Sequence, residues 1–187
     1  MNILLLLKNI LAYVEGLIGA NELEVNMLLL LKNILFTLLV PGTSAVYIPL
    51  WIIASRGVPP LSEWNTAQVA AVLPLSLGTA IYVWCVWHFA VSGRGTPAPI
   101  DAPKRLVVQG PYRYVRNPMY VGVLLVIVGW AVFFWSSALL IYGLGVGMLV
   151  HVFVVLLEEP LLEQQFGQAY VNYREAVGRW LPRMGHK

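Results

Sequence analysis

The chain has 187 residues, of which 59% are hydrophobic and 11% are charged, and its mean hydropathy is +0.73. A soluble domain of this length carries about 25% charged residues and cannot bury so much apolar surface in one core. The composition therefore excludes an ordinary soluble domain and indicates a protein of the lipid bilayer. The net charge of +3 is too small to indicate nucleic acid as a partner.

An octapeptide, LLLLKNIL, occurs at 4–11 and again at 28–35. No longer series of copies follows, so the repeat does not indicate a solenoid. We expect 1–26 to be an N-terminal extension or leader, with a natural start at Met27 and a single membrane domain over 27–187. Charged residues interrupt the first copy, which favours a possible extra amphipathic helix on the membrane surface over a membrane span.

Charged residues are absent from three long stretches of the chain, 33–55, 64–93 and 117–157. A helix needs roughly 20 apolar residues to cross the hydrocarbon, so the last stretch is long enough for two spans. We therefore predict an all-α integral membrane fold with about four transmembrane helices, near 28–54, 66–92, 119–135 and 137–157. A tight turn at Trp135, Ser136 and Ser137 would join the last two, of which the first is short.

Basic residues are concentrated in the loop 93–118 and in the C-terminal tail, whereas the loop 55–65 holds only Arg56 and Glu63. Loops rich in lysine and arginine stay on the cytoplasmic side of a membrane. The sequence thus predicts a multi-pass protein with 93–118 and the C-terminus in the cytoplasm and 55–65 on the outside.

Two arginines, Arg113 and Arg116, precede Pro118, which suits the first turn of the third span. The N–H groups at a helix start, together with these guanidinium groups, would form a seat for a carboxylate or a phosphate. The alternative is that the arginines only anchor the protein to anionic head groups, with the neighbouring tyrosines as an aromatic belt.

Two adjacent carboxylates, Glu158 and Glu159, follow the fourth apolar stretch. At the mouth of a helical bundle they suit a positively charged ligand, or else they form an ordinary membrane-edge ion pair with Arg113 or Arg116. Apolar residues then recur at helical spacing between 160 and 178, which predicts a C-terminal amphipathic helix that begins where the fourth span ends.

His151 lies within the fourth span, two helical turns before Glu158, so a regular helix places both on one face. An ionisable residue inside a membrane helix is a functional candidate, and His151 is the candidate general base. The alternative is a neutral histidine that is hydrogen-bonded to a neighbouring helix.

Two motifs carry a resemblance to a known group of enzymes: GPYRYVRNPMYVG at 110–122 and EEPLLEQQFGQAYVNYREAVGRWLPR at 158–183. Together they resemble the isoprenylcysteine carboxyl methyltransferase and phospholipid methyltransferase superfamily, over about 100–183. The resemblance implies an integral membrane enzyme that uses S-adenosylmethionine and methylates a lipophilic or lipid-like acceptor from the bilayer.

By matching position, the resemblance implies a cofactor-binding part within about 93–183. The residues that it places at the cofactor are Lys104, Arg105, Leu106, Val107, Tyr112, Asn117, Pro118, Met119, Tyr120 and Glu158. Arg116 would seat the cofactor carboxylate and is, with His151, a candidate catalytic residue, whereas Glu158 would bind the ammonium or a ribose hydroxyl. The implied partners are membrane lipid and a lipophilic small molecule, and neither a metal nor nucleic acid is expected.

Two positions depart from the pattern of that superfamily. Its histidine is Asn117 here, and asparagine forms hydrogen bonds but cannot titrate. Members that act on prenylcysteine carry an arginine where this chain has Val154, so a carboxylate acceptor loses its obvious partner. Two other functions stay open, an NADPH-dependent sterol-reductase-like membrane enzyme and a non-enzymatic membrane protein that binds lipid or a partner.

Overall fold

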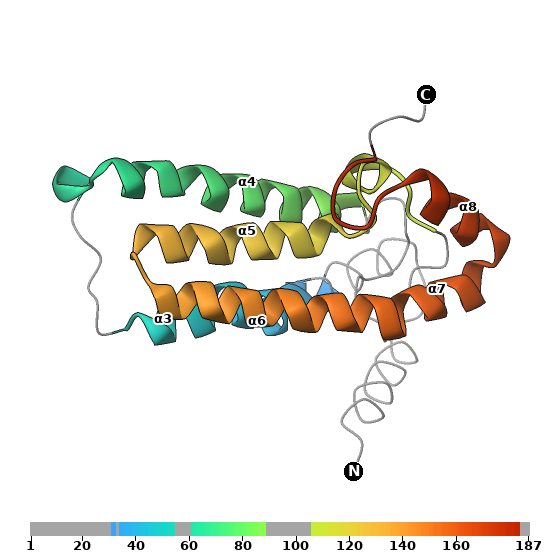
Figure 1. Ribbon diagram of the computed structural model, residues 1–187, viewed down its shortest axis with the longest axis horizontal. Coiled ribbons are helices and arrows are strands. Elements are labelled where there is room, and N and C mark those ends of the chain that lie inside the picture. Colours follow the sequence, from blue (N-terminus) through green and yellow to red (C-terminus); the bar gives the residue numbers. More distant parts are fainter. Residues whose placement is uncertain (1–30, 33, 55–60, 89–105, 184–187) are drawn as a thin grey trace, which may run out of the picture.

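The computed structural model describes residues 31–32, 34–54, 61–88 and 106–183 (Figure 1). Within these ranges the chain is mostly helical, and its β-structure is an isolated bridge between Val115 and Gly178. The predicted all-α fold is therefore confirmed for the described part of the chain. The expected extension at 1–26 and the basic residues Lys104 and Arg105 lie outside it.

Among the described residues, three helices are long and apolar enough to cross a membrane, Ile34–Ile52, Thr66–His88 and Ser137–Phe166. The first contains the π-helical turn η1 (Thr43–Tyr47) and ends in α3 (Ile48–Ile52), and the second is α4 (Thr66–His88), which follows the 3₁₀ turn η2 (Leu61–Glu63). The third consists of α6 (Ser137–Phe153), the π-helical turn η6 (Val154–Glu158) and α7 (Glu159–Phe166). The remaining elements are η5 (Gly110–Arg113), α5 (Pro118–Phe133) and α8 (Gln168–Ala176).

All four predicted apolar helices are present, but α5 is shorter than the others. It has 16 residues, or about 24 Å at a rise of ~1.5 Å per residue, against a hydrocarbon thickness of about 30 Å. A span shorter than the hydrocarbon is accommodated by local thinning of the bilayer or by flanking side chains that reach the interface.

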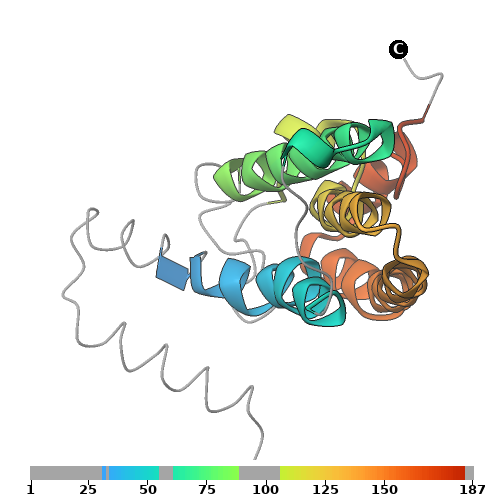
Figure 2. The same cartoon turned by 90° about the vertical axis from the view of Figure 1, so that its left-hand side faces the viewer.

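Helix α5 lies between α4 and α6, and the three run side by side (Figure 1). Helices α4 and α5 approach closely where a Cβ atom at Gly78 would lie 2.5 Å from the carbonyl oxygen of Gly122. Small residues allow membrane helices to pack backbone against backbone. The helix Ile34–Ile52 completes the bundle (Figure 2), and Trp130 of α5 donates a hydrogen bond from Nε1 to the carbonyl of Ala45 at 3.1 Å.

A tight turn joins α5 to α6 at the predicted position. Trp135 has a φ of 47°, a left-handed conformation that few residues other than glycine adopt. Ser136 then caps α6, because its hydroxyl accepts a hydrogen bond from the backbone N–H of Leu139 at 3.4 Å. The reversal brings the end of α6 back beside the start of α5.

The helix does not end with the predicted fourth span at 157 but continues through η6 and α7 to Phe166. In η6 the N–H of Glu159 bonds to the carbonyl of Val154, five residues earlier, so the turn holds one extra residue. Pro160 follows at once, in the first turn of α7. Proline has no backbone N–H to donate. Because the π-helical turn has already shifted the backbone hydrogen bonds at this point, the proline does not end the helix.

The amphipathic segment predicted over 160–178 is two helices rather than one. Gly167 has φ 56° and ψ −133°, a conformation that essentially only glycine adopts, and it turns the chain between α7 and α8. The turn folds α8 back toward the start of α5, where Tyr170 is almost fully buried.

Candidate active site

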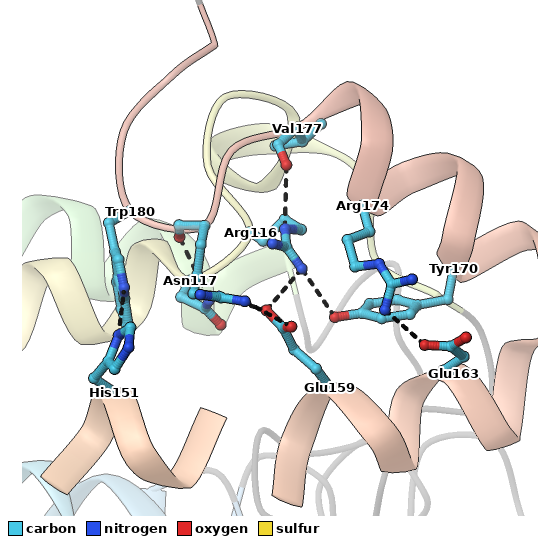
Figure 3. A network of polar contacts seen from close by, with 10 residues as sticks. Arg116, Asn117, His151, Glu159, Glu163, Tyr170, Arg174, Val177 and Trp180 are labelled. Atoms are coloured by element: carbon cyan, nitrogen blue, oxygen red, sulfur yellow. Dashed lines mark hydrogen bonds and ion pairs between the residues drawn. The ribbon is translucent and has the colours of Figure 1, made fainter. Parts of the chain in front are cut away.

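Several segments of the chain meet at one end of the bundle (Figure 1). These segments are η5, the start of α5, η6, the first turn of α7, α8 and the C-terminal segment 177–180. They meet because α5 and α6 are antiparallel, so the first turn of one lies beside the last turn of the other. Figure 3 shows the polar contacts of this region.

Glu159 is the centre of a buried ion-pair network (Figure 3). Its Oε1 lies 2.8 Å from Nη1 of Arg116 and 2.6 Å from Nε of Arg179, and its Oε2 accepts from Nη2 of Arg179 at 2.9 Å. The side chains of Arg116 and Glu159 are only 7% and 10% exposed. The hydrogen bond to Glu159 raises the pKa of Arg179. The alternative expectation of a membrane-edge ion pair is thus confirmed for Glu159 and Arg116.

Arg116 also fixes the C-terminal segment to the start of α5. Its Nε donates to the carbonyl of Val177 at 3.1 Å, its backbone N–H donates to the carbonyl of Gly178 at 2.8 Å, and Nη1 donates to the Tyr170 hydroxyl at 3.2 Å. A side chain at Gly178 would collide with the carbonyl of Leu181, so the close fold of this segment requires glycine. The guanidinium of Arg116 therefore has a structural role, and its predicted catalytic role stays a prediction.

Glu158 has a different partner from its neighbour. The Tyr120 hydroxyl donates to its Oε2 at 3.0 Å, and in the part of the chain that the structure describes Glu158 forms no ion pair. Tyr112 is nearby: burial raises its pKa well above the usual value, and the Cys85 thiol and then the Glu158 charge add to the shift. Glu158 and the two tyrosines therefore share one buried environment.

Asn117 precedes the first turn of α5 and is 7% exposed. Its Nδ2 donates to the carbonyl of Arg179 at 3.4 Å, and its side chain does not cap the helix. The next residue, Pro118, has no N–H to satisfy. The first N–H groups of α5 and the positive end of its dipole are thus left for another acceptor, which favours an anion at this position.

An apolar wall lies beside these polar groups. It is a buried cluster formed by Cys85, Val107, Tyr112 and Met119. Leu106, at the start of the described segment, is partly buried next to it. The hydroxyl of Tyr173 donates to the carbonyl of Tyr112 at 2.6 Å and thereby ties η5 to α8.

His151 is exposed on α6 and accepts, at Nδ1, a hydrogen bond from Nε1 of Trp180 at 3.2 Å (Figure 3). A neutral imidazole that accepts at Nδ1 carries its proton on Nε2. His151 can therefore take up a proton only after the bond from Trp180 opens, and its role as a base stays a prediction. The extra residue in η6 also changes the helical register between His151 and Glu158. Their seven-residue spacing therefore does not by itself place them on one face of the helix.

A comparison with protein families agrees with this arrangement. Residues 66–169, more than half of the chain, match the phospholipid methyltransferase family. The chain belongs to the phospholipid methyltransferase family. Membership of this family identifies the protein as a membrane methyltransferase. Among curated proteins, none matches the chain.

The family match runs from the start of α4 into α8 and thus includes most of the predicted site of this phospholipid methyltransferase relative. The predicted cofactor residues that lie together at one end of the bundle are Leu106, Val107, Tyr112, Asn117, Pro118, Met119, Tyr120 and Glu158. Their role at a cofactor stays a prediction. His151 lies at the edge of this group, connected to it through Trp180.

Three residues of the site were not among the predicted ones, namely Tyr170, Arg179 and Trp180. Glu159 was expected only as one of two adjacent carboxylates. Adjacent residues of a helix point about 100° apart. This spacing favours different partners for Glu158 and Glu159. Arg179 and Trp180 lie beyond the matched range, and only the folded position of the segment 177–180 shows that they belong to the site.

Proposed function

We propose that this chain is an S-adenosylmethionine-dependent methyltransferase that acts on a lipophilic or lipid-like acceptor at the cytoplasmic face of the membrane. Family membership supports methyl transfer, and three long apolar helices support the bilayer as its place of action. The observation that carries the proposal is the different environment of two adjacent carboxylates. Glu159 holds both arginines, whereas Glu158 is bonded to the neutral Tyr120 hydroxyl, so its carboxylate is the one available to a cationic ligand.

The chemistry of the site fits this cofactor, which has a carboxylate, an ammonium, a sulfonium and an adenine. Glu158 would bind the ammonium or a ribose hydroxyl through a charge-assisted hydrogen bond. The uncapped start of α5, next to Arg116, would receive the carboxylate. Tyr112 and Tyr120 offer aromatic faces to the adenine, or to the sulfonium by cation–π attraction.

When bound, the cofactor supplies an electrophilic methyl group. The contribution of the chain is to bind, to align and to exclude water, which are large terms in bimolecular transfer. The network around Glu159 holds the start of α5 in place, and burial of Tyr112 and Asn117 keeps water from this side of the site. Asn117 cannot titrate, so no proton passes through the position of the family histidine.

The cytoplasmic placement rests on the distribution of charge. The site lies at the start of α5, which follows the basic loop 93–118 in the sequence, and Arg179 of the C-terminal segment binds Glu159 there. Basic segments favour the cytoplasmic side. A cofactor that is made in the cytosol would then reach the site directly, while the acceptor arrives within the bilayer.

Two alternative functions differ in the groups that they need. NADPH carries a 2′-phosphate and calls for cationic side chains, but Arg116 and Arg179 are bonded to Glu159. A membrane protein that only binds lipid head groups needs cations at the surface and has no use for the partly buried Glu158–Tyr120 pair. Both observations favour the sulfonium nucleotide.

Calorimetry separates the three functions. Detergent-purified protein is titrated in parallel with S-adenosylhomocysteine, NADPH and phosphatidylglycerol in mixed micelles. Saturable heat with S-adenosylhomocysteine alone is expected. Heat with NADPH alone, or with the anionic lipid alone, would overturn the proposal. Incubation of active protein with radiolabelled S-adenosylmethionine and total lipid extract then identifies the acceptor as the labelled species.

A further inference from the structure

Trp180 connects the lipid-facing side of the bundle to the site. Its indole N–H donates to Nδ1 of His151 on α6 at 3.2 Å, and the two ring centroids are 6.1 Å apart. On its other side the indole meets Tyr120 of α5 edge-to-face, with a centroid distance of 6.5 Å. Trp180 thus bridges α5 and α6 from a segment that belongs to neither helix.

The two neighbours of Trp180 lie in different surroundings. His151 is on the exposed surface of α6, together with Leu144, which is 75% exposed, and Met148, which is 66% exposed. In a bilayer such an apolar helix surface faces lipid. Tyr120, in contrast, is partly buried and donates its hydroxyl to Glu158. The indole therefore stands between the lipid-facing surface and the residues proposed to hold the cofactor.

The backbone before Trp180 is held firmly, whereas the residue after it is not covered. Arg179 binds Glu159 through its guanidinium, and its carbonyl accepts from Asn117. Leu181 is 77% exposed and apolar. The position of Trp180 is thus fixed by the network of the site, while its ring makes one polar contact within the described part of the chain, to His151.

We propose that Trp180 is the acceptor-positioning residue on the bilayer side of the site. This inference rests on the proposed function. The lipophilic acceptor keeps its chain in the bilayer beside α6, and its reacting head passes between the indole and Tyr120 toward Glu158. Trp180 packs against the part of the acceptor that joins head to chain, and His151 sets the angle of the indole.

The chemistry of indole suits this task. A tryptophan is rigid, has a large apolar face for a lipid chain, and places its N–H at the polar side of a membrane interface. A smaller side chain would leave the acceptor loosely placed, and misplacement of a reacting group lowers the rate of transfer strongly. Binding of the cofactor, which the proposal assigns to other residues, does not depend on the indole.

A kinetic comparison tests the proposal with Trp180→Ala and Trp180→Phe. Radiolabelled S-adenosylmethionine and vesicles that contain phosphatidylethanolamine at varied mole fraction serve as probes. In Trp180→Ala we expect KM for the vesicle lipid to rise about tenfold or more, and kcat to fall less. Trp180→Phe keeps an aromatic ring of similar thickness, and its KM is expected to lie much closer to that of the wild-type protein than to that of Trp180→Ala. The dissociation constant for S-adenosylhomocysteine should stay within about twofold in both variants.

A second measurement does not depend on the identity of the acceptor. The chain has 7 tryptophans, so the difference between the fluorescence of the wild-type protein and of Trp180→Phe isolates the emission of Trp180. In vesicles of phosphatidylcholine brominated near the head-group end of the acyl chain, this component should be quenched. An unquenched component would place Trp180 away from the bilayer and would overturn the inference.

The outcomes also separate this inference from the proposed function. Failure of the wild-type protein to bind S-adenosylhomocysteine overturns both. Binding and transfer by the wild-type protein, with an unchanged KM in Trp180→Ala, overturn only the role of Trp180. A loss of S-adenosylhomocysteine affinity in Trp180→Ala equal to the loss in transfer would assign the indole to the cofactor side and would also overturn it.

Discussion

Arg116 and Glu159, 43 residues apart in the chain, form an ion pair with both side chains buried and an Nη1–Oε1 distance of 2.8 Å. The pair joins the start of α5 to the first turn of α7, and Arg179 adds the C-terminal segment to it. A buried charge that loses its partner is costly, because the desolvated ion is left without compensation. The network therefore holds three segments together around the site, and a mutation that breaks the network tests this structural role directly.

Replacing Glu159 by glutamine should destabilise the protein. The change leaves two arginines facing a neutral amide, and the loss of a buried partner costs about 3–5 kcal/mol. Glu163→Gln is the matched control, because Glu163 pairs with Arg174 at 2.6 Å while both side chains are well exposed, at 44% and 37%. An exposed pair contributes only about 0–1 kcal/mol. Thermal unfolding in one detergent should rank Glu159→Gln well below Glu163→Gln, and equal melting temperatures would contradict the structural role of the network.

Replacing Glu158 by alanine should weaken binding of the cofactor strongly and leave the fold intact. Within the described part of the chain Glu158 makes one hydrogen bond, from Tyr120, so few contacts of the protein itself are lost. The loss of a charge-assisted hydrogen bond to a ligand is worth about 1.5–3 kcal/mol, or tenfold or more in affinity. Calorimetry with S-adenosylhomocysteine measures the effect.

Tyr120→Phe is the companion variant for Glu158. It removes the hydroxyl and keeps the ring, so the carboxylate loses its hydrogen bond within the protein. We expect affinity for S-adenosylhomocysteine to change by less than about threefold. Unchanged affinity in Glu158→Ala would remove this carboxylate from the cofactor site.

The sequence was sufficient to predict the apolar helices and the turn between α5 and α6, because these follow from hydropathy and from local chain reversal. It was not sufficient to show that the helix continues beyond the fourth span. Glu158, Glu159 and Pro160 are ordinary signals of a helix end, but a π-helical turn absorbs them and the helix continues. Such a turn depends on tertiary contacts of Glu158 and Glu159, which a local pattern does not contain.

The residues of the site also fall into those that the sequence predicted and those that it did not. The resemblance placed Tyr112, Asn117 and Glu158 at one site, and their common location in the structure is explained by the antiparallel hairpin. An ion pair of the two glutamates with Arg113 or Arg116 was expected from the sequence, but the sequence did not show that Glu159 is the partner of Arg116 or that Arg179 joins the network. The place of Trp180 depended on the fold of the C-terminal segment, which hydropathy does not determine.

Replacing Gly78 by alanine should disrupt the contact between α4 and α5. A Cβ atom there would lie 2.5 Å from the carbonyl oxygen of Gly122, so the helices must move apart, and overpacking costs about 1–3 kcal/mol. Gly145→Ala in α6 is the control, because nothing lies within 4 Å of a Cβ atom at that position. We expect Gly145→Ala to be neutral or slightly stabilising, since alanine favours helix by about 1 kcal/mol over glycine. A Gly78 variant as stable as the Gly145 variant would refute the close approach.

Alkaline conditions should weaken the contact between η5 and α8. Burial raises the pKa of Tyr173, whose hydroxyl donates to the carbonyl of Tyr112, and burial likewise raises the pKa of Tyr112 above its ordinary value of 10.0. Because the unfolded chain loses these protons first, their contribution to stability is complete below about pH 10 and is lost as the pH rises through the folded pKa values. The unfolding midpoint in detergent should therefore fall above about pH 10. In Tyr173→Phe, which has one such phenol fewer, the decline should be shallower, and parallel curves for the two proteins would show that Tyr173 is not the group involved.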